Sequence, residues 1–150
     1  TYEAKVDTTK ANALLDCELR LRLRAPRGMR TALSTIKYDG LANLQAGVTG
    51  KLDAYYTWRG QPIEAQSQTP MVLTGPYNDM FTFLDRVDVT RWSACDTEET
   101  FVLQTFLSVV NNAQPRRLGS MRVSQSEIDI QSQVSRSLVI EFLLGPCPAR

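Results

Sequence analysis

The clearest pattern in the chain is a strict alternation of apolar and charged residues from residue 15 to residue 24. The apolar positions are Leu15, Cys17, Leu19, Leu21 and Leu23, and the charged positions are Asp16, Glu18, Arg20, Arg22 and Arg24. Successive side chains of a β-strand point to opposite faces of the sheet, so a period of two predicts a half-buried strand. The Pro and Gly of the following APRGM sequence predict a turn.

Similar alternation recurs along most of the chain, with turn residues between the segments. It is visible in residues 31–40, 46–62, 80–89 and 117–131. The segment 99–110 is apolar on both faces, which is typical of a central strand, and 137–147 also reads as strongly buried. Residues 8–16 are the best helical candidate, but the segment is too short to be convincing.

Roughly eight or nine short strands separated by turns predict an antiparallel sandwich or barrel. Of these we expect an all-β, two-sheet β-sandwich stabilised by a disulfide. The sequence contains no linker, repeat or low-complexity tract, so residues 1–150 are expected to form a single domain.

The composition of the chain argues against several classes of function. The chain has 150 residues, of which 43% are hydrophobic and 22% charged, values compatible with one well-packed domain. A net charge of +1 gives no general attraction to nucleic acid or acidic lipid. No apolar run approaches the roughly 18 residues of a membrane span. The chain begins without Met or a signal-peptide pattern, as if it had been processed or trimmed.

The sequence contains no histidine. This excludes Ser-His-Asp and Cys-His nucleophilic sites and His-ligated zinc within one chain. We therefore expect a protein that is not an enzyme and that has no cofactor and no metal site.

Three widely spaced cysteines leave two alternatives open. Cys17, Cys95 and Cys147 form no CxxC pattern. Either all three are buried thiols, or the chain is secreted and has one internal disulfide and one cysteine whose partner lies elsewhere. Their spacing does not identify the pair.

Several short motifs follow one another in order. A cysteine opens the alternating leucine strand, a Pro-x-Gly turn follows, and a Tyr-x-Gly run precedes the block Ala46-Gly47-Val48-Thr49-Gly50. Then come LTGPYND, RWSAC and a terminal strand that ends at Cys147. In this order the motifs resemble the secreted fungal and bacterial family called domain of unknown function 4360, over nearly the whole chain.

This resemblance implies a secreted, disulfide-bonded, β-rich protein, and it transfers no activity and no catalytic residue. Members of the family usually have an additional amino-terminal stretch with a fourth cysteine, which is missing here. The resemblance therefore implies a disulfide between Cys17 and Cys95. It also implies a partner for Cys147 on that separate segment.

Arg20, Arg22 and Arg24 would lie on one strand face at intervals of roughly 6.6–6.8 Å. Two further arginines follow closely, so a basic strip for a sulfated or phosphorylated polymer is one interpretation. The alternative is a solvent-facing row that pairs with carboxylates on neighbouring strands and discourages aggregation at a sheet edge. The low net charge favours the alternative.

Aromatic residues offer a second candidate surface. Tyr55 and Tyr56 must point to opposite faces of their strand, with Trp58 on the side of Tyr56. A sugar-binding site needs exposed rings beside acidic or amide groups, and the candidates are Tyr55, Asp53, Tyr77, Asn78 and Asp79. The alternative is that Tyr56 and Trp58 fill the core and Tyr55 is an ordinary surface ring.

The acidic residues are a third candidate group. They are Asp85, Asp88, Asp96, Glu98 and Glu99. Two opposed carboxylates can hydrolyse a glycosidic bond, whereas calcium would need six to eight oxygen ligands and no Asp-x-Asp-x-Asp-Gly loop is present. Local ion pairs such as Asp85 with Arg86 are the favoured interpretation. The glycines of residues 46–50 predict a bulge or tight bend, not a phosphate loop.

Together these patterns predict a secreted, non-catalytic module that binds or coats extracellular material, such as carbohydrate, cell wall or protein. A self-assembling extracellular subunit with an open sheet edge is the alternative. Its partner would be a second copy or a separate amino-terminal segment joined through Cys147. A small hydrolase that uses carboxylates is a more distant third.

Overall fold

The computed structural model describes residues 2–58, 60–63, 70–87, 91–124, 126–129 and 134–149, and side chains are described outside 124–137. In these parts the regular elements are eleven strands. They are β1 (Tyr2–Val6), β2 (Asn12–Arg24), β3 (Met29–Leu44), β4 (Val48–Trp58), β5 (Gln61–Ile63), β6 (Met71–Thr74), β7 (Tyr77–Arg86), β8 (Glu98–Asn111), β9 (Gly119–Ser124), β10 (Ser126–Asp129) and β11 (Val134–Pro146). No helix long and apolar enough to span a membrane occurs among the described residues.

The first sheet is built around the long strand β3. Its described strands are ordered β1-β9-β3-β11-β10, and β7 also pairs with β3. Residues 29–38 of β3 pair with β11 and residues 39–44 pair with β9, whereas β7 pairs with residues 35–44. Because β7 overlaps both of the other partners, it must occupy the opposite edge of β3.

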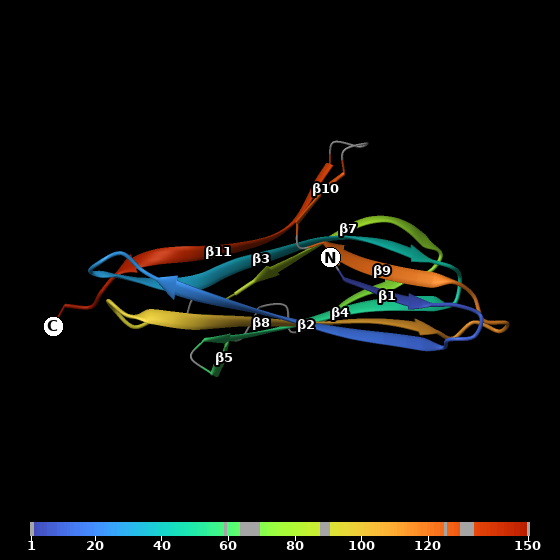
Figure 1. The fold of residues 1–150 in the computed structure, drawn as a ribbon, viewed down its shortest axis with the longest axis horizontal. Coiled ribbons are helices and arrows are strands. Elements are labelled where there is room, and N and C mark those ends of the chain that lie inside the picture. The colour runs from blue at the N-terminus through green and yellow to red at the C-terminus, as the bar shows by residue number, and fades with distance from the viewer. Residues whose placement is uncertain are drawn as a thin grey trace.

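The second sheet has β8 at its centre. The order is β2-β8-β4-β5, and β6 pairs with another part of β4. All ladders described in both sheets are antiparallel. Figure 1 shows the two sheets as two long layers, with the β10–β11 hairpin projecting from one of them. The predicted all-β fold with two antiparallel sheets is confirmed.

The core lies between the two layers. A cluster of rings fills one part of it, where Phe101 of β8 contacts Trp58 at 5.9 Å and Phe142 at 5.5 Å between ring centroids. In another part the hydroxyl of Tyr56 donates a 2.7 Å hydrogen bond to Asp85 and lies 3.1 Å from the hydroxyl of Tyr38. The core positions expected for Tyr56 and Trp58 are thus observed.

The turn between β3 and β4 carries the chain from one sheet to the other. Gly47 has a φ of +83°, and a Cβ at this position would lie 2.9 Å from the Cβ of Ala113. Both facts favour glycine. The tight bend predicted for residues 46–50 is therefore present, and it begins β4 at Val48.

Three details differ from the sequence predictions. The described strands outnumber the expected eight or nine because β1 lies outside the predicted segments and the single segment 117–131 contains both β9 and β10. Residues 12–16 begin β2 and form no helix. The segment 137–147 is half-exposed, with Leu143 at 44% and Leu144 at 55% exposure. An apolar run does not distinguish an edge strand from a central one. Among the described strands, β11 pairs with β3 alone beyond its short pairing with β10.

Candidate functional site

The outer face of the second sheet is a three-strand surface of alternating residues from β2, β8 and β4. The ladder places Glu18 of β2 opposite Gln104 of β8, and Gln104 opposite Tyr55 of β4. One step along the same face, Asp16 lies opposite Phe106, which lies opposite Asp53. Residues that are opposite one another share a face, so these six side chains are neighbours in the order that the register imposes.

A shallow groove crosses this face. Its volume is about 500 Å³, and its lining includes Arg20, Glu18, Val102, Gln104, Tyr55 and Thr57. A second depression of about 520 Å³ is lined by Leu14, Asp53, Tyr55, Gln104 and Phe106. Because Tyr55 and Gln104 line both, the two depressions meet at these residues. We call the combined feature the Tyr55 groove.

Tyr55 is the most exposed ring of this surface. Its exposed fraction is 58%, and its ring meets Phe106 edge-on with the centroids 5.7 Å apart. Edge-to-face contact holds the tyrosine against β8 and leaves ring surface available to a ligand.

Charged groups flank the ring on both sides. Arg20 forms an ion pair with Glu18 at 2.5 Å, and Lys51 forms one with Asp53 at 2.8 Å. The hydrogen bond to Asp53 raises the pKa of Lys51. The groove therefore combines an apolar ring with an amide and with both signs of charge.

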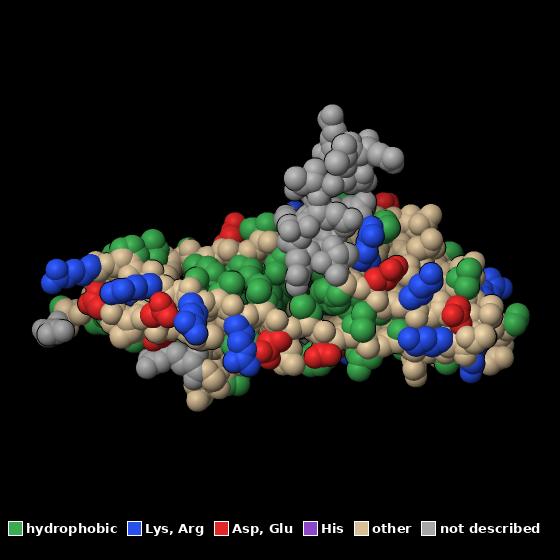
Figure 2. All heavy atoms as spheres, viewed as in Figure 1, with side chains coloured by type: hydrophobic (Ala, Val, Ile, Leu, Met, Phe, Trp, Pro, Cys, Tyr) green, Lys and Arg blue, Asp and Glu red, His purple; other side chains and the backbone are tan. Residues whose placement is uncertain are grey.

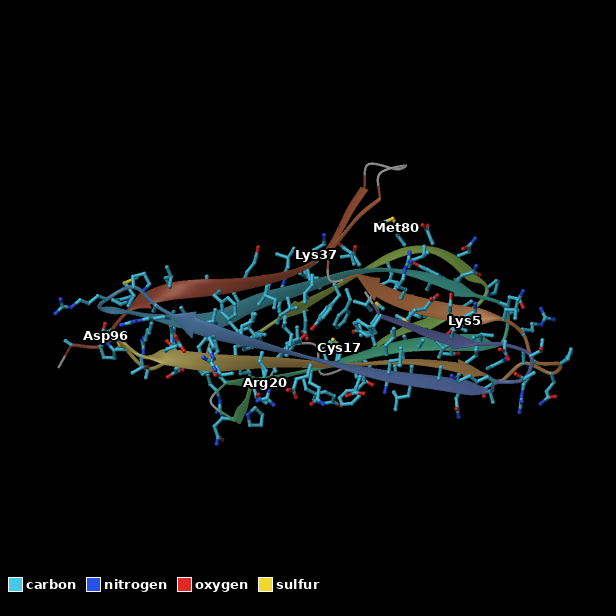
Figure 3. All side chains as sticks on the ribbon, in the orientation of Figure 1. Lys5, Cys17, Arg20, Lys37, Met80 and Asp96 are labelled. Carbon is cyan, nitrogen blue, oxygen red and sulfur yellow. A yellow bond between two sulfur atoms is a disulfide. The ribbon has the colours of Figure 1, made fainter. Side chains whose placement is uncertain are left out.

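The remaining arginines of β2 continue along the same face, away from Tyr55. Arg22 lies opposite Thr100 and Arg24 lies opposite Glu98, and both arginines are exposed. The predicted arginine row therefore exists as a geometric feature, and only its first member lines the groove. Figure 3 shows Arg20 on the outside of the layer and Cys17 between the layers.

The other proposed sugar-binding residues lie elsewhere. Tyr77, Asn78 and Asp79 belong to β7 of the first sheet, so the structure separates them from Tyr55. Tyr77 donates a 2.8 Å hydrogen bond to the carbonyl oxygen of Met80, and Asp79 accepts one from the Met80 amide at 2.7 Å. These contacts organise the beginning of β7.

The cysteine pairing implied by the family resemblance is wrong. The disulfide joins Cys95 to Cys147, 52 residues later, with the Cα atoms 5.9 Å apart. Cys17 lies opposite Thr105, and the length of β8 from residue 98 to residue 105 alone spans about 23 Å. A disulfide needs Cα atoms within about 7 Å, so Cys17 does not reach Cys95.

The disulfide is part of a larger closure at this end of the sandwich. The Cys147 amide donates a 2.9 Å hydrogen bond to the carbonyl oxygen of Gly28, in the turn between β2 and β3. The Gly28 amide in turn donates to the carboxylate of Asp96, also at 2.9 Å. The end of β11, the β2–β3 turn and the start of β8 are thereby held together.

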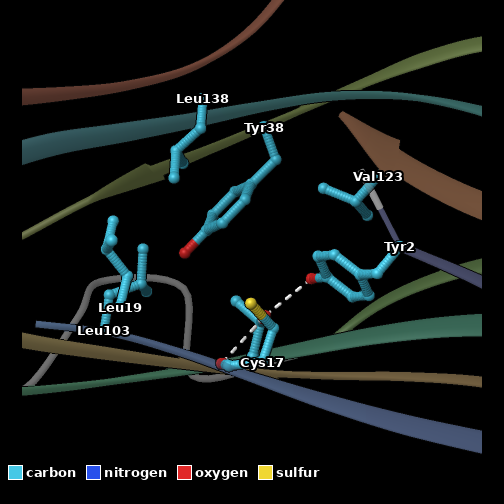
Figure 4. Close-up of a pocket in the computed structure, with 8 residues that line it drawn as sticks. Tyr2, Cys17, Leu19, Tyr38, Leu103, Val123 and Leu138 are labelled. Atoms are coloured by element: carbon cyan, nitrogen blue, oxygen red, sulfur yellow. Dashed lines mark hydrogen bonds between the residues drawn. The ribbon is translucent and has the colours of Figure 1, made fainter. Parts of the chain in front are cut away.

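Cys17 points between the sheets, as the alternation predicted. It lines a cavity of about 10 Å³ together with Tyr2, Tyr38, Leu103, Val123 and other core residues (Figure 4). That volume is close to the size of one water molecule and is too small for an organic ligand. The hydroxyls of Tyr2 and Thr105 are 2.6 Å apart there, and burial raises the pKa of Tyr2 to about 12.

Two of the candidate carboxylates are buried acceptors in the core. Asp85 is 1% exposed and binds Tyr56, whereas the adjacent Arg86 is exposed on the other face of β7, so the expected Asp85–Arg86 ion pair is not supported. Glu99 is 7% exposed and accepts hydrogen bonds from the Trp58 indole and from the Ala94 amide. Asp88 lies outside the described residues.

Sequence reasoning missed Phe106 and Gln104 as members of the site. Both fall within residues 99–110, which are apolar enough to be read as buried on both sides. The sequence did contain a signal. The polar residues Thr100, Gln104 and Ser108 all have even numbers, and in β8 they alternate with the most buried residues, so the even-numbered residues form the outer face.

Similarity to known proteins identifies the family of this chain. The family model described as Domain of unknown function (DUF4360) matches residues 1–138. A protein of Arthroderma benhamiae named "Uncharacterized secreted protein" is 32% identical over 82 residues. That match covers 53% of this chain and 33% of the relative, so the matched residues span about a third of the relative's length. With its family model matched over nearly its whole length, the chain belongs to the DUF4360 family.

Proposed function

We propose that this protein is an extracellular, non-catalytic binding module whose ligand is a polysaccharide bound in the Tyr55 groove. The observation that carries the proposal is the exposed Tyr55 ring, at the meeting point of two depressions on an ordered sheet face. A shallow and open groove suits a polymer better than a small ligand that needs an enclosed pocket.

The chemistry of the groove supports a sugar ligand. A tyrosine ring offers an apolar face for the C–H side of a sugar and has few rotamers to lose on binding. The Gln104 amide can donate and accept hydrogen bonds, while Arg20 donates and Asp53 accepts them. Sugar hydroxyls need both kinds of partner at the rim of such a ring.

An extracellular role has two supports. The name of the Arthroderma benhamiae relative describes a secreted protein. The Cys95–Cys147 disulfide is of the kind that persists in oxidising compartments.

A non-catalytic role is supported by the chain's lack of histidine and by the use of two candidate acids inside the core. Asp85 and Glu99 come from β7 and β8, which belong to different sheets. Each is already engaged by a core side chain, Tyr56 and Trp58 respectively.

Co-sedimentation with insoluble polysaccharides and binding to a panel of soluble glycans test the proposal. We expect binding to at least one polysaccharide, and we expect Tyr55→Ala to abolish it. Tyr77→Ala is the matched control, because it removes a tyrosine from the other sheet and should leave binding intact. Absence of binding to every polysaccharide, or equal losses in both variants, would overturn the proposal.

A further inference from the structure

Strand β2 forms an open edge of the second sheet. Among the described strands its one hydrogen-bonded neighbour is β8, which pairs with it along all of residues 12–24. Within the described part of the chain, no strand pairs with the backbone groups on the other side of β2. Such an edge is a template for pairing unless its side chains prevent it.

The outward residues of β2 divide into an acidic half and a basic half. Asp16 and Glu18 come first, and Arg20, Arg22 and Arg24 follow, all of them exposed on the same face. Figure 2 shows basic and acidic side chains close together along the layer that contains β2. When a strand with this polarity meets a reversed copy of itself, unlike charges face one another.

The inward residues of β2 are incompletely covered. Leu19, Leu21 and Leu23 pack against the core cluster but remain partly exposed. Figure 2 shows apolar side chains reaching the surface between the two layers. A further strand beside β2 would remove part of this apolar surface from water, which favours association.

We propose that two copies of this protein pair through β2 in antiparallel orientation, with Leu19 of one copy opposite Leu19 of the other. On the outer face this register places Glu18 opposite Arg20 and Asp16 opposite Arg22, each twice because of the two-fold symmetry. On the inner face Cys17 lies opposite Leu21. Charged residues thus meet opposite charges, and apolar residues meet apolar ones.

Neighbouring registers are less favourable. A register centred on Arg20, the next residue of the outer face, places Arg20 opposite Arg20. A register centred on Glu18 places Glu18 opposite Glu18. A shift that exchanges the faces places leucines opposite charged residues. The sequence of β2 therefore specifies one antiparallel register.

A contact of this kind closes on itself. The same strand is used by both copies, so a two-fold pair leaves no second β2 edge for further growth, and the product is a dimer rather than a filament. The dimer has one continuous sheet with two Tyr55 grooves on the same side. Dimer formation does not depend on whether the groove binds polysaccharide, and it is measured without any glycan.

Sedimentation velocity of the whole chain is the first test. We expect a dimer at high protein concentration in low salt, and loss of the dimer in high salt because exposed ion pairs are screened. A monomer at millimolar concentration in low salt overturns the proposal.

Charge reversal tests the register. The variants D16R/E18R and R20E/R22E each place like charges opposite one another, so each alone should be a monomer. An equimolar mixture should form a heterodimer, because every reversed pair is again complementary. R24E is the matched control on the same strand, since Arg24 faces the uncharged Leu14 of the second copy, and it should remain dimeric.

Circular dichroism of each variant checks that the fold persists, and a misfolded protein would not regain a partner on mixing. A mixture that stays monomeric, a dimer formed by either double variant alone, or loss of the dimer in R24E overturns the proposed pairing. Failure of glycan binding with an intact dimer would count against the polysaccharide proposal alone.

Discussion

Cys95 and Cys147 are covalently joined at the end of the sandwich, shortly before β8 and directly after β11. The bond links strands of different sheets, because β8 lies in the second sheet and β11 in the first. It therefore joins the two layers covalently at this end of the sandwich, in addition to the ring contacts of Phe142 with Phe101 and Trp58.

Replacing Cys147 with serine is expected to destabilise the protein by about 4 kcal/mol, because the disulfide spans 52 residues and restricts the unfolded chain accordingly. Urea unfolding with and without reductant measures the effect. Cys17→Ser is the control and should keep full sensitivity to reductant. If the wild-type protein and Cys147→Ser unfolded at the same urea concentration, the stabilising role of the bond would be disproved.

Truncating Phe101 tests the ring cluster between the sheets. Its side chain is fully buried and contacts Tyr56, Trp58 and Phe142, so Phe101→Ala should cost about 3–5 kcal/mol of unfolding free energy. Phe106→Ala is the matched control on the outward face of the same strand. It should cost much less stability and should weaken glycan binding, and the reverse order of stabilities would contradict the assignment of the two faces.

We expect the free energy of unfolding to decrease at alkaline pH, starting at a pH below that at which the buried tyrosines ionise in the folded protein. Burial raises the pKa of Tyr2 to about 12, and it also raises the pKa values of Tyr38 and Tyr56. Tyrosine in the unfolded chain has a pKa near 10, so the unfolded state loses its protons first as the pH rises. The stabilisation that is present below about pH 10 is therefore lost as the pH rises toward the tyrosine pKa values of the folded protein.

Calorimetric unfolding between neutral pH and pH 11 measures this loss. Tyr2→Phe should flatten the alkaline part of the profile, although it also removes the hydrogen bond with Thr105 at every pH. An identical alkaline slope in Tyr2→Phe and the wild type would show that Tyr2 makes no such contribution.

The bend between β3 and β4 should not accept a side chain. Gly47→Ala would place a Cβ on a residue with a left-handed backbone and in close contact with Ala113. We expect it to lower the free energy of unfolding by more than about 1 kcal/mol. Gly60 also has a positive φ, of 72°, but open space beside it. Gly60→Ala therefore isolates the backbone cost, and chemical denaturation of both variants should show the larger loss at Gly47.

Period-two patterns identified strand faces correctly where one side of the strand is charged. In β2 the alternation assigned Cys17 to the inside and the arginines to the outside, as observed. This result depends only on strand geometry, which a local pattern contains.

The alternation within one strand does not predict which strands are neighbours or which sheet each strand joins. The disulfide depends on which strand ends meet, and the separation of Tyr77 from Tyr55 depends on which sheet each strand joins. The exposure of Leu143 and Leu144 depends on the place of β11 at the edge of the described sheet. These features are set by sheet order, which alternation within one segment does not encode.

Glu99 accepts hydrogen bonds from the Trp58 indole and from the amide of Ala94, the residue next to Cys95. An indole whose N–H is bound to a carboxylate changes its emission when that carboxylate moves. Opening the disulfide would free the chain beside Ala94 and so disturb this carboxylate. We therefore expect reduction of the disulfide to change the emission of Trp58, without any added label.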